Sequence, residues 1–155
     1  MKTLWIHLLI GICFLTATSL YATEKATKEE CMTMCRKAAA LAQEKGAEEM
    51  IAQVSDPHGP FVWKDTYLYI IDLDTKFVVA HPIRPNLTNR DMFGLKDING
   101  KMFFVEMFNI ATEKGEGWLD YMWPKPGENK PSSKSTFVLR VPDHNYAVVS
   151  GIYTD

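Results

Sequence analysis

A helix with a narrow face of small residues, near the start of the chain, restricts what the rest can become. Thr27 and Glu30 have the spacing of a capping box, in which a hydroxyl and a carboxylate satisfy the unpaired amides of a helix N-terminus. Small residues then recur at steps of four, three and four: Cys31, Cys35, Ala38 and Ala42. Such a face lets a helix pack close to a sheet, so we expect a long amphipathic helix here and a β-sheet beneath it.

The remaining segments predict that sheet. Gly46 interrupts the helix, and residues 47–54 have the pattern of a second, short helix. β-Branched and aromatic residues predict five strands, of which the first two form a hairpin, at 66–72, 77–81, 118–123, 135–141 and 146–153. A helical pattern at 102–111 joins the hairpin to the last three strands. This order predicts one α+β domain with an antiparallel five-stranded sheet.

Residues 1–22 are unlike the rest of the chain. Lys2 is followed by an apolar run from Leu4 to Leu15, and small and polar residues then lead to Ala22. This layout is typical of a secretory signal peptide cleaved after Ala22. A membrane anchor is the alternative, but the apolar run is shorter than the roughly 20 residues that span a bilayer. We therefore expect a periplasmic or secreted domain of residues 23–155, with no membrane span after cleavage.

Composition and motifs exclude several classes of protein. Of the 155 residues, 46% are hydrophobic and 23% charged, as in a folded globular protein, and the net charge of −2 disfavours a nucleic-acid binder. Neither a nucleophile–base pair nor a phosphate-binding glycine loop is present, so no enzyme is expected. The scattered histidines lack zinc-site spacing, so we also expect no cofactor.

The segment Cys31-Met-Thr-Met-Cys35 leaves three interpretations open. Thiolates and thioethers are soft donors that suit Cu(I), which would make the chain a periplasmic copper-handling protein. The two cysteines could also form a strained disulfide across one helical turn. The third interpretation is that two small apolar side chains pack the helix on the sheet.

Several motifs together resemble a known family. Their order and spacing match a single Cache domain (sCache, type 2) of bacterial periplasmic sensors, in a free-standing form, over nearly the whole chain after residue 27. The motifs are Asp56-Pro-His-Gly-Pro-Phe61, Tyr69-Ile-Ile-Asp72-Leu-Asp74, Ala80-His81-Pro82, Gly115-Glu-Gly117-Trp-Leu-Asp-Tyr121-Met-Trp123-Pro124 and Gly151-Ile-Tyr153.

The resemblance implies a fold and a function. The fold is a PAS-like sheet with a long N-terminal helix, and the function is sensing of a small organic acid such as acetate, propionate, lactate or pyruvate. A membrane-bound signalling partner, a role in chemotaxis and a homodimer through the N-terminal helix are further expectations. The chain departs from the family pattern at Thr75, where a turn glycine is common, and at Phe137, where tyrosine is common. The second change removes a hydroxyl that a relative could offer its ligand.

Five residues are candidates for the ligand site. Lys134 can supply the positive charge that a buried carboxylate needs, or it can be a solvated surface lysine. Tyr121 and Trp123 share a face of their strand and carry donors on apolar rings, although core aromatics do the same. His81 ends a strand and can pair with an anion or with a nearby carbonyl. Tyr69, on the neighbouring strand, completes the set.

Overall fold

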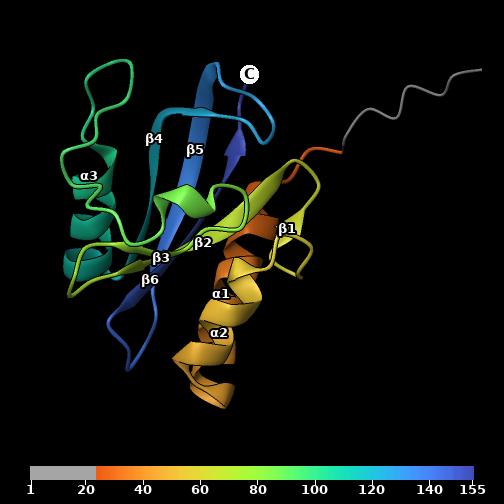
Figure 1. Cartoon of the computed structure of the whole chain (residues 1–155), viewed down its shortest axis with the longest axis vertical. Helices are drawn as coiled ribbons and strands as arrows, with labels where there is room; N and C mark the ends of the chain where they lie inside the picture. The colour runs from red at the N-terminus through yellow and green to blue at the C-terminus, as the bar shows by residue number, and fades with distance from the viewer. Residues whose placement is uncertain (1–23) are drawn as a thin grey trace, which may run out of the picture.

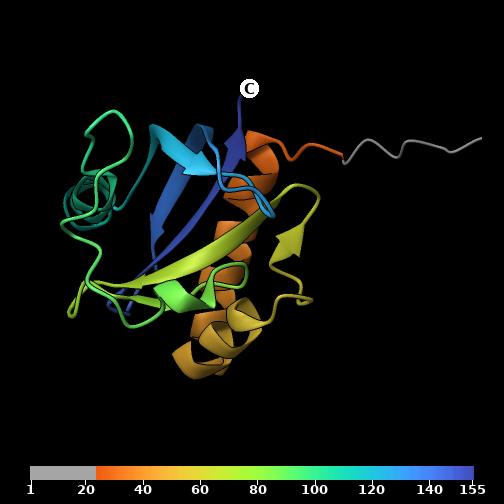
Figure 2. The same ribbon diagram turned by 45° about the horizontal axis from the view of Figure 1, so that its top comes forward.

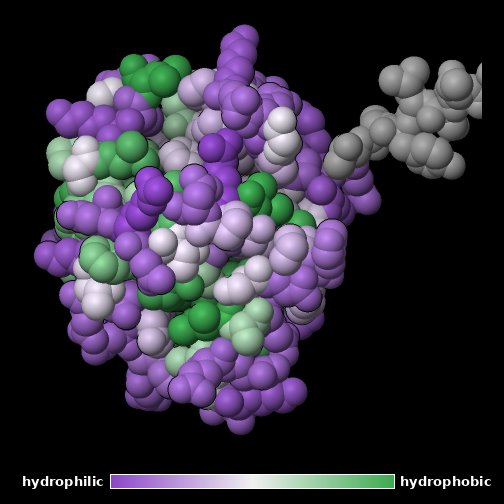
Figure 3. Space-filling model, in the orientation of Figure 1, coloured by the Kyte–Doolittle hydropathy of each residue, from purple (hydrophilic) through white to green (hydrophobic). Residues whose placement is uncertain are grey.

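The computed structural model describes residues 24–155 as one α+β domain (Figure 1). The predicted signal peptide, residues 1–22, lies outside the described residues. Within residues 24–155, no helix is long and apolar enough to cross a bilayer. Hydrophilic side chains cover most of the face in Figure 3, and apolar ones reach it only in small separate areas.

The two N-terminal helices form as the sequence predicts. Helix α1 spans Lys28–Lys45 and helix α2 spans Ala47–Ser55. The capping box is complete, because the Glu30 amide donates to Thr27 Oγ1 at 3.2 Å and the Thr27 amide donates to Glu30 Oε2 at 2.9 Å. Gly46 separates the helices with a φ of 92°, a conformation that glycine adopts without strain.

The sheet is antiparallel and has one strand more than predicted. Its strands run in the order β1-β2-β6-β5-β4, and β3 pairs with β2 outside this path. The extra strand is the two-residue β1, which is too short to leave a periodic pattern in the sequence. The bounds are β1 Val62–Trp63, β2 Thr66–Asp72, β3 Val78–Ala80, β4 Glu116–Pro124, β5 Pro131–Arg140 and β6 Tyr146–Tyr153.

A long connection and one helix lie between the hairpin and the last three strands. The connection contains the short 3₁₀ turn η1 at Pro85–Leu87, and α3 then spans Phe103–Asn109. The helix widens into the π-helical turn η2 at Ile110–Lys114, past the predicted end at residue 111. Gly115, with a φ of 81°, ends it and leads into β4.

The sheet separates two apolar layers. Helices α1 and α2 lie on one side of it, and α3 lies on the other side (Figures 1 and 2). On the α1 side, Leu68, Ile70 and Val148 pack with Cys35, Ala38 and Ala42. On the α3 side, Tyr69, Val149 and Val138 pack with Phe103, Phe104 and Met107. Because side chains alternate along a strand, each strand contributes to both layers.

The structure favours packing as the role of the cysteine pair. Cys31 and Cys35 are free thiols, both fully buried on the sheet-facing side of α1. Burial raises the pKa of each thiol, so both stay protonated at neutral pH. A Cu(I) site needs accessible thiolates, which these two buried thiols do not offer.

Candidate functional site

Three polar side chains form a row across the α3 side of the sheet. Tyr121 on β4 pairs with Lys134 on β5, and Lys134 pairs with Tyr153 on β6. Residues that pair directly across antiparallel strands point to the same face. The register therefore brings together an ammonium and two phenols that are far apart in the sequence.

A small cavity, lined mostly by buried side chains, lies over this face. The volume open to the centre of a water molecule is ≈ 10 Å³, about enough for one water. Four of the five predicted site residues line it, namely Tyr69, His81, Tyr121 and Trp123, together with Tyr67, Leu87, Phe103 and Phe104. Lys134 lies directly behind the Tyr67 wall, with its Nζ 4.3 Å from the Tyr67 ring centroid.

Lys134 is fully buried and has no counter-ion. Its side chain is 0% exposed, and its Nζ has no hydrogen-bond partner among the described residues. Besides the Tyr67 ring, its nearest aromatic contact is the Tyr153 ring, at 4.9 Å. Burial by itself lowers the pKa of Lys134, and the net rise comes from attraction to Tyr67, Tyr121 and Tyr153 in their phenolate form. Lys134 is therefore a buried lysine rather than the surface lysine of the alternative interpretation.

His81 is neutral, and the structure fixes which ring nitrogen carries the proton. The Arg84 amide donates to His81 Nδ1 at 3.0 Å, so the proton lies on Nε2. Burial, with the positive charges of Lys134 and Arg84, lowers the pKa of His81 to about 3. His81 can thus donate one hydrogen bond from Nε2 toward the cavity that it lines, but it brings no charge. The sequence left open a hydrogen bond between His81 and a nearby carbonyl. In the structure, His81 instead accepts a hydrogen bond from the Arg84 amide.

The aromatic residues play different parts. The Tyr69 hydroxyl donates to the Met107 sulfur at 3.1 Å, and the Tyr69 ring stacks on His81 with centroids 5.3 Å apart. Tyr69 thus forms part of the cavity wall, and its hydroxyl already has a hydrogen-bond partner. Tyr121 stacks on Phe103 at 4.4 Å, and Trp123 meets the edge of the same ring at 5.6 Å. Phe103 and Phe104 both pack in the core and line the cavity.

The structure adds residues that the sequence reasoning missed. Tyr67 is two positions before Tyr69, so the alternation that placed Tyr69 on this face could have found it. Thr136 follows Lys134 by two positions on the same face, and its buried Oγ1 also has no partner. Leu87 comes from the irregular connection, where no periodicity signals its direction.

The tyrosine hydroxyl that Phe137 lacks would not have reached the cavity. Phe137 lies on the α1 side of β5, where its ring packs against Trp118 with centroids 5.3 Å apart. Lys134 and the cavity lie on the opposite face. A hydroxyl at position 137 would point away from the cavity, so its loss leaves the cavity unchanged.

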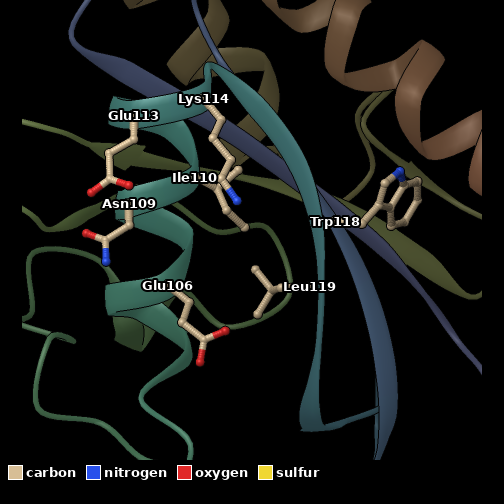
Figure 4. Close-up of a pocket in the computed structure, with 7 residues that line it drawn as sticks. All are labelled: Glu106, Asn109, Ile110, Glu113, Lys114, Trp118 and Leu119. Atoms are coloured by element: carbon tan, nitrogen blue, oxygen red, sulfur yellow. The ribbon is translucent and has the colours of Figure 1, made fainter.

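A larger hollow, of ≈ 250 Å³, lies between α3 and β4 (Figure 4). Glu106 and Glu113 project from the helix on its rim, and Leu119 points toward it from β4, whereas Trp118 points to the far side of the sheet. None of the predicted site residues lines it. Its lining holds two carboxylates against one ammonium, that of Lys114, and this negative balance disfavours an anionic ligand, so the small cavity is the better candidate for the acid site.

Comparison with known sequences identifies relatives. A family model described as a Cache domain matches residues 6–155, including most of the predicted signal peptide. The methyl-accepting chemotaxis protein McpP of Pseudomonas putida (strain KT2440) is 33% identical over 91 residues, which is 59% of this chain and 16% of the relative. The chain thus spans about one sixth of the length of this curated relative.

Solved structures share the fold. One, described as the structural basis for carboxylic acid recognition by a Cache chemosensory domain, matches with a TM-score of 0.70 at 26% identity, covering 82% of this chain and 92% of that one. A periplasmic sensor domain of a chemotaxis protein matches with a TM-score of 0.65 at 30% identity, covering 82% and 90%. A methyl-accepting chemotaxis protein of Vibrio parahaemolyticus has the same fold, with a TM-score of 0.66 at 22% identity, covering 83% and 86%.

The family match extends over almost the entire chain, and the sheet, the N-terminal helix and the neighbouring structures agree with it. This chain belongs to the Cache domain family and has the fold of a single Cache domain.

Proposed function

We propose that this chain is the extracytoplasmic sensing domain of a chemotaxis or related signalling system, and that it binds a short-chain carboxylate in the small cavity. One observation carries the proposal: the Lys134 ammonium is fully buried, and no hydrogen-bond partner or carboxylate lies near its Nζ among the described residues. A buried, uncompensated charge is costly, and a bound carboxylate would remove that cost.

The other polar groups around the cavity support an anion rather than a cation. Lys134, His81 Nε2 and the Tyr121 hydroxyl all offer protons. No Asp or Glu lines the cavity. A carboxylate accepts hydrogen bonds through both oxygens and donates none, so it complements this set of donors. Phe103, Phe104 and Leu87 provide apolar walls for a short alkyl chain.

The relatives agree with this proposal. A neighbour in fold is described as recognising carboxylic acids, and the curated relative is a chemotaxis receptor. In such a system the acid would be the signal and a membrane-bound receptor the partner. Secretion after cleavage at Ala22 and a homodimer through α1 belong to the same proposal. N-terminal sequencing and light scattering of the purified protein would test these two parts.

Calorimetry tests the proposal directly. We expect the wild-type protein to bind at least one of acetate, propionate, lactate and pyruvate, and Lys134→Met to weaken that binding by about 30-fold or more. Lys130→Met removes an exposed lysine from the neighbouring loop and serves as the matched control, with unchanged affinity. If no acid binds the wild-type protein, or if Lys134→Met binds normally, the proposal is wrong.

A further inference from the structure

The cavity is too small for an organic acid, so binding requires part of its wall to move. Its volume of ≈ 10 Å³ is about that of one water, and even acetate is several times larger. Six of the eight lining residues are 5% exposed or less. The other two, Leu87 and Trp123, are half-buried. The wall is therefore thinnest between Leu87 in the connection and Trp123 on β4.

Arg84 bridges this thin part of the wall. Its guanidinium lies over the Trp123 ring, 5.6 Å from the centroid, and its Nη2 donates to the Glu128 main-chain carbonyl at 3.0 Å. On the other side, the Arg84 carbonyl accepts from the Leu87 amide at 3.0 Å in the η1 turn. One residue thus ties the turn that carries Leu87 to β4 and to the loop after it.

We propose that Arg84 is the latch that closes the entrance of the ligand cavity. Release of its guanidinium from Glu128 and Trp123 frees the η1 turn and opens the wall between Leu87 and Trp123. The identity of the ligand in this inference rests on the proposed function. The existence of the latch does not depend on that function. The Arg84 amide continues to hold His81 Nδ1 in either state of the side chain, because that bond is made by the main chain.

The latch predicts a particular kinetic effect. The acid enters and leaves only through the open form, and the latch closes over the occupied cavity as it does over the empty one. Removing the latch makes opening easier for the empty and the occupied protein alike, so both rates rise while the affinity changes little. A hydrogen bond to a charged group and a cation–π contact are lost together, which corresponds to about a tenfold increase in both rates.

Two variants provide matched controls for Arg84→Ala. Glu128→Ala removes a side chain but keeps the carbonyl that accepts from Arg84, so its rates should equal those of the wild type. Arg90→Ala removes an exposed cation from the same connection and tests for a general effect of charge. Stopped-flow measurement with an acid that the wild type binds should give the tenfold increase for Arg84→Ala alone. Unchanged rates, or a slower association, would overturn the latch.

Hydrogen exchange of the ligand-free protein tests the latch without any acid. The Asn89 amide donates to the Val78 carbonyl at 2.9 Å and the Leu87 amide to Arg84, so both bonds break when the turn opens. We expect these amides to exchange about tenfold faster in Arg84→Ala, and at the wild-type rate in Glu128→Ala. Equal exchange in all three proteins would overturn the latch. Faster exchange in a protein that binds no acid would support it and would contradict only the proposed ligand.

Discussion

At the scale of single residues, the site combines a fully buried lysine with a neutral imidazole ring. His81 is buried with a pKa of about 3, so it stays neutral between pH 5 and 8. The site therefore offers the same set of donors across this range. Affinity for a fully ionised acid should be nearly independent of pH, which suits a sensor that reports concentration rather than acidity.

His81 should make the stability of the domain depend on pH below neutrality. Its pKa is lower in the folded protein, about 3, than the ordinary value of 6.5 expected when unfolded. Between these values only the unfolded chain takes up the proton, so stability is complete above pH 6.5 and falls toward pH 3, by up to about 1.4 kcal/mol per pH unit. Urea unfolding at pH 4.5 and 7 should show this loss in the wild type, and a smaller one in His81→Asn.

The exposed His58 provides the control for this experiment. His58→Asn should keep the wild-type dependence on pH. If His81→Asn also keeps it, the loss of stability in acid arises elsewhere and the neutral state assigned to His81 is wrong.

Lys134→Met separates a binding role from a structural one. Without ligand, the ammonium makes no hydrogen bond that the variant would lose. Replacing a buried, uncompensated charge by an apolar side chain of similar length should leave stability unchanged or raise it, by as much as about 1 to 4 kcal/mol. Thermal unfolding in the absence of acid measures this effect. A strong fall in melting temperature would show that Lys134 serves the fold and not the ligand.

At the scale of elements, close contact between neighbouring elements explains three of the small residues. A Cβ at Gly151 on β6 would clash with the Ser135 carbonyl oxygen and Thr136 Oγ1, and would lie 2.8 Å from Thr136 Cα. Glycine is required there because backbone atoms cannot move aside. On the other face of the sheet, Cys35 and Ala38 are 0% exposed and bring α1 close to the sheet. The small-residue face of α1 follows from sequence reasoning, whereas only the structure shows why position 151 needs glycine.

Gly151→Ala should destabilise the domain by about 2 to 3 kcal/mol, as an overpacked core site does. Gly94→Ala is the matched control, because a Cβ there would meet no atom within 4 Å and the backbone has no positive φ. Chemical denaturation should distinguish the two variants clearly. Equal stability of both would mean that β5 and β6 are further apart than described.

The two cysteines of α1 should not react while the domain is folded. Both thiols are fully buried and protonated, so a thiol reagent should modify neither of them in native buffer and both of them in denaturant. Rapid reaction of the native protein would revive the metal-binding interpretation. A lack of reaction even in denaturant would indicate a disulfide.

At the scale of the whole molecule, the sequence predicts the elements better than it predicts the site. Helices α1 and α2 and strands β2 and β6 lie within one or two residues of their expected bounds, because capping residues and alternation are local signals. The cavity depends on the register between strands and on the path of an irregular connection. The Tyr121–Lys134–Tyr153 row is therefore visible only after folding, and Leu87 had no sequence signal at all.

The same row leads from the cavity to both ends of the described chain. Tyr153 contacts the Lys134 ammonium and donates from its hydroxyl to the Pro124 carbonyl at 2.8 Å. Two residues further on, Asp155 binds Lys125 through its side chain at 3.1 Å and accepts from Lys25 through its main-chain oxygen at 3.3 Å. A carboxylate that attracts the ammonium away from the Tyr153 ring would thus change the packing at the point where the two ends of the domain meet.

Hydrogen exchange with and without a bound acid should detect this connection. We expect binding to change exchange in the cavity walls and in residues 24–27 and 153–155, whereas α2, which packs on the other face of the sheet, should keep its rate. Tyr153→Phe keeps the ring on Lys134 but removes the bond to Pro124, so it should bind the acid normally and lose most of the change at the ends. Changes confined to the cavity walls of the wild type would mean that binding is not transmitted along this row.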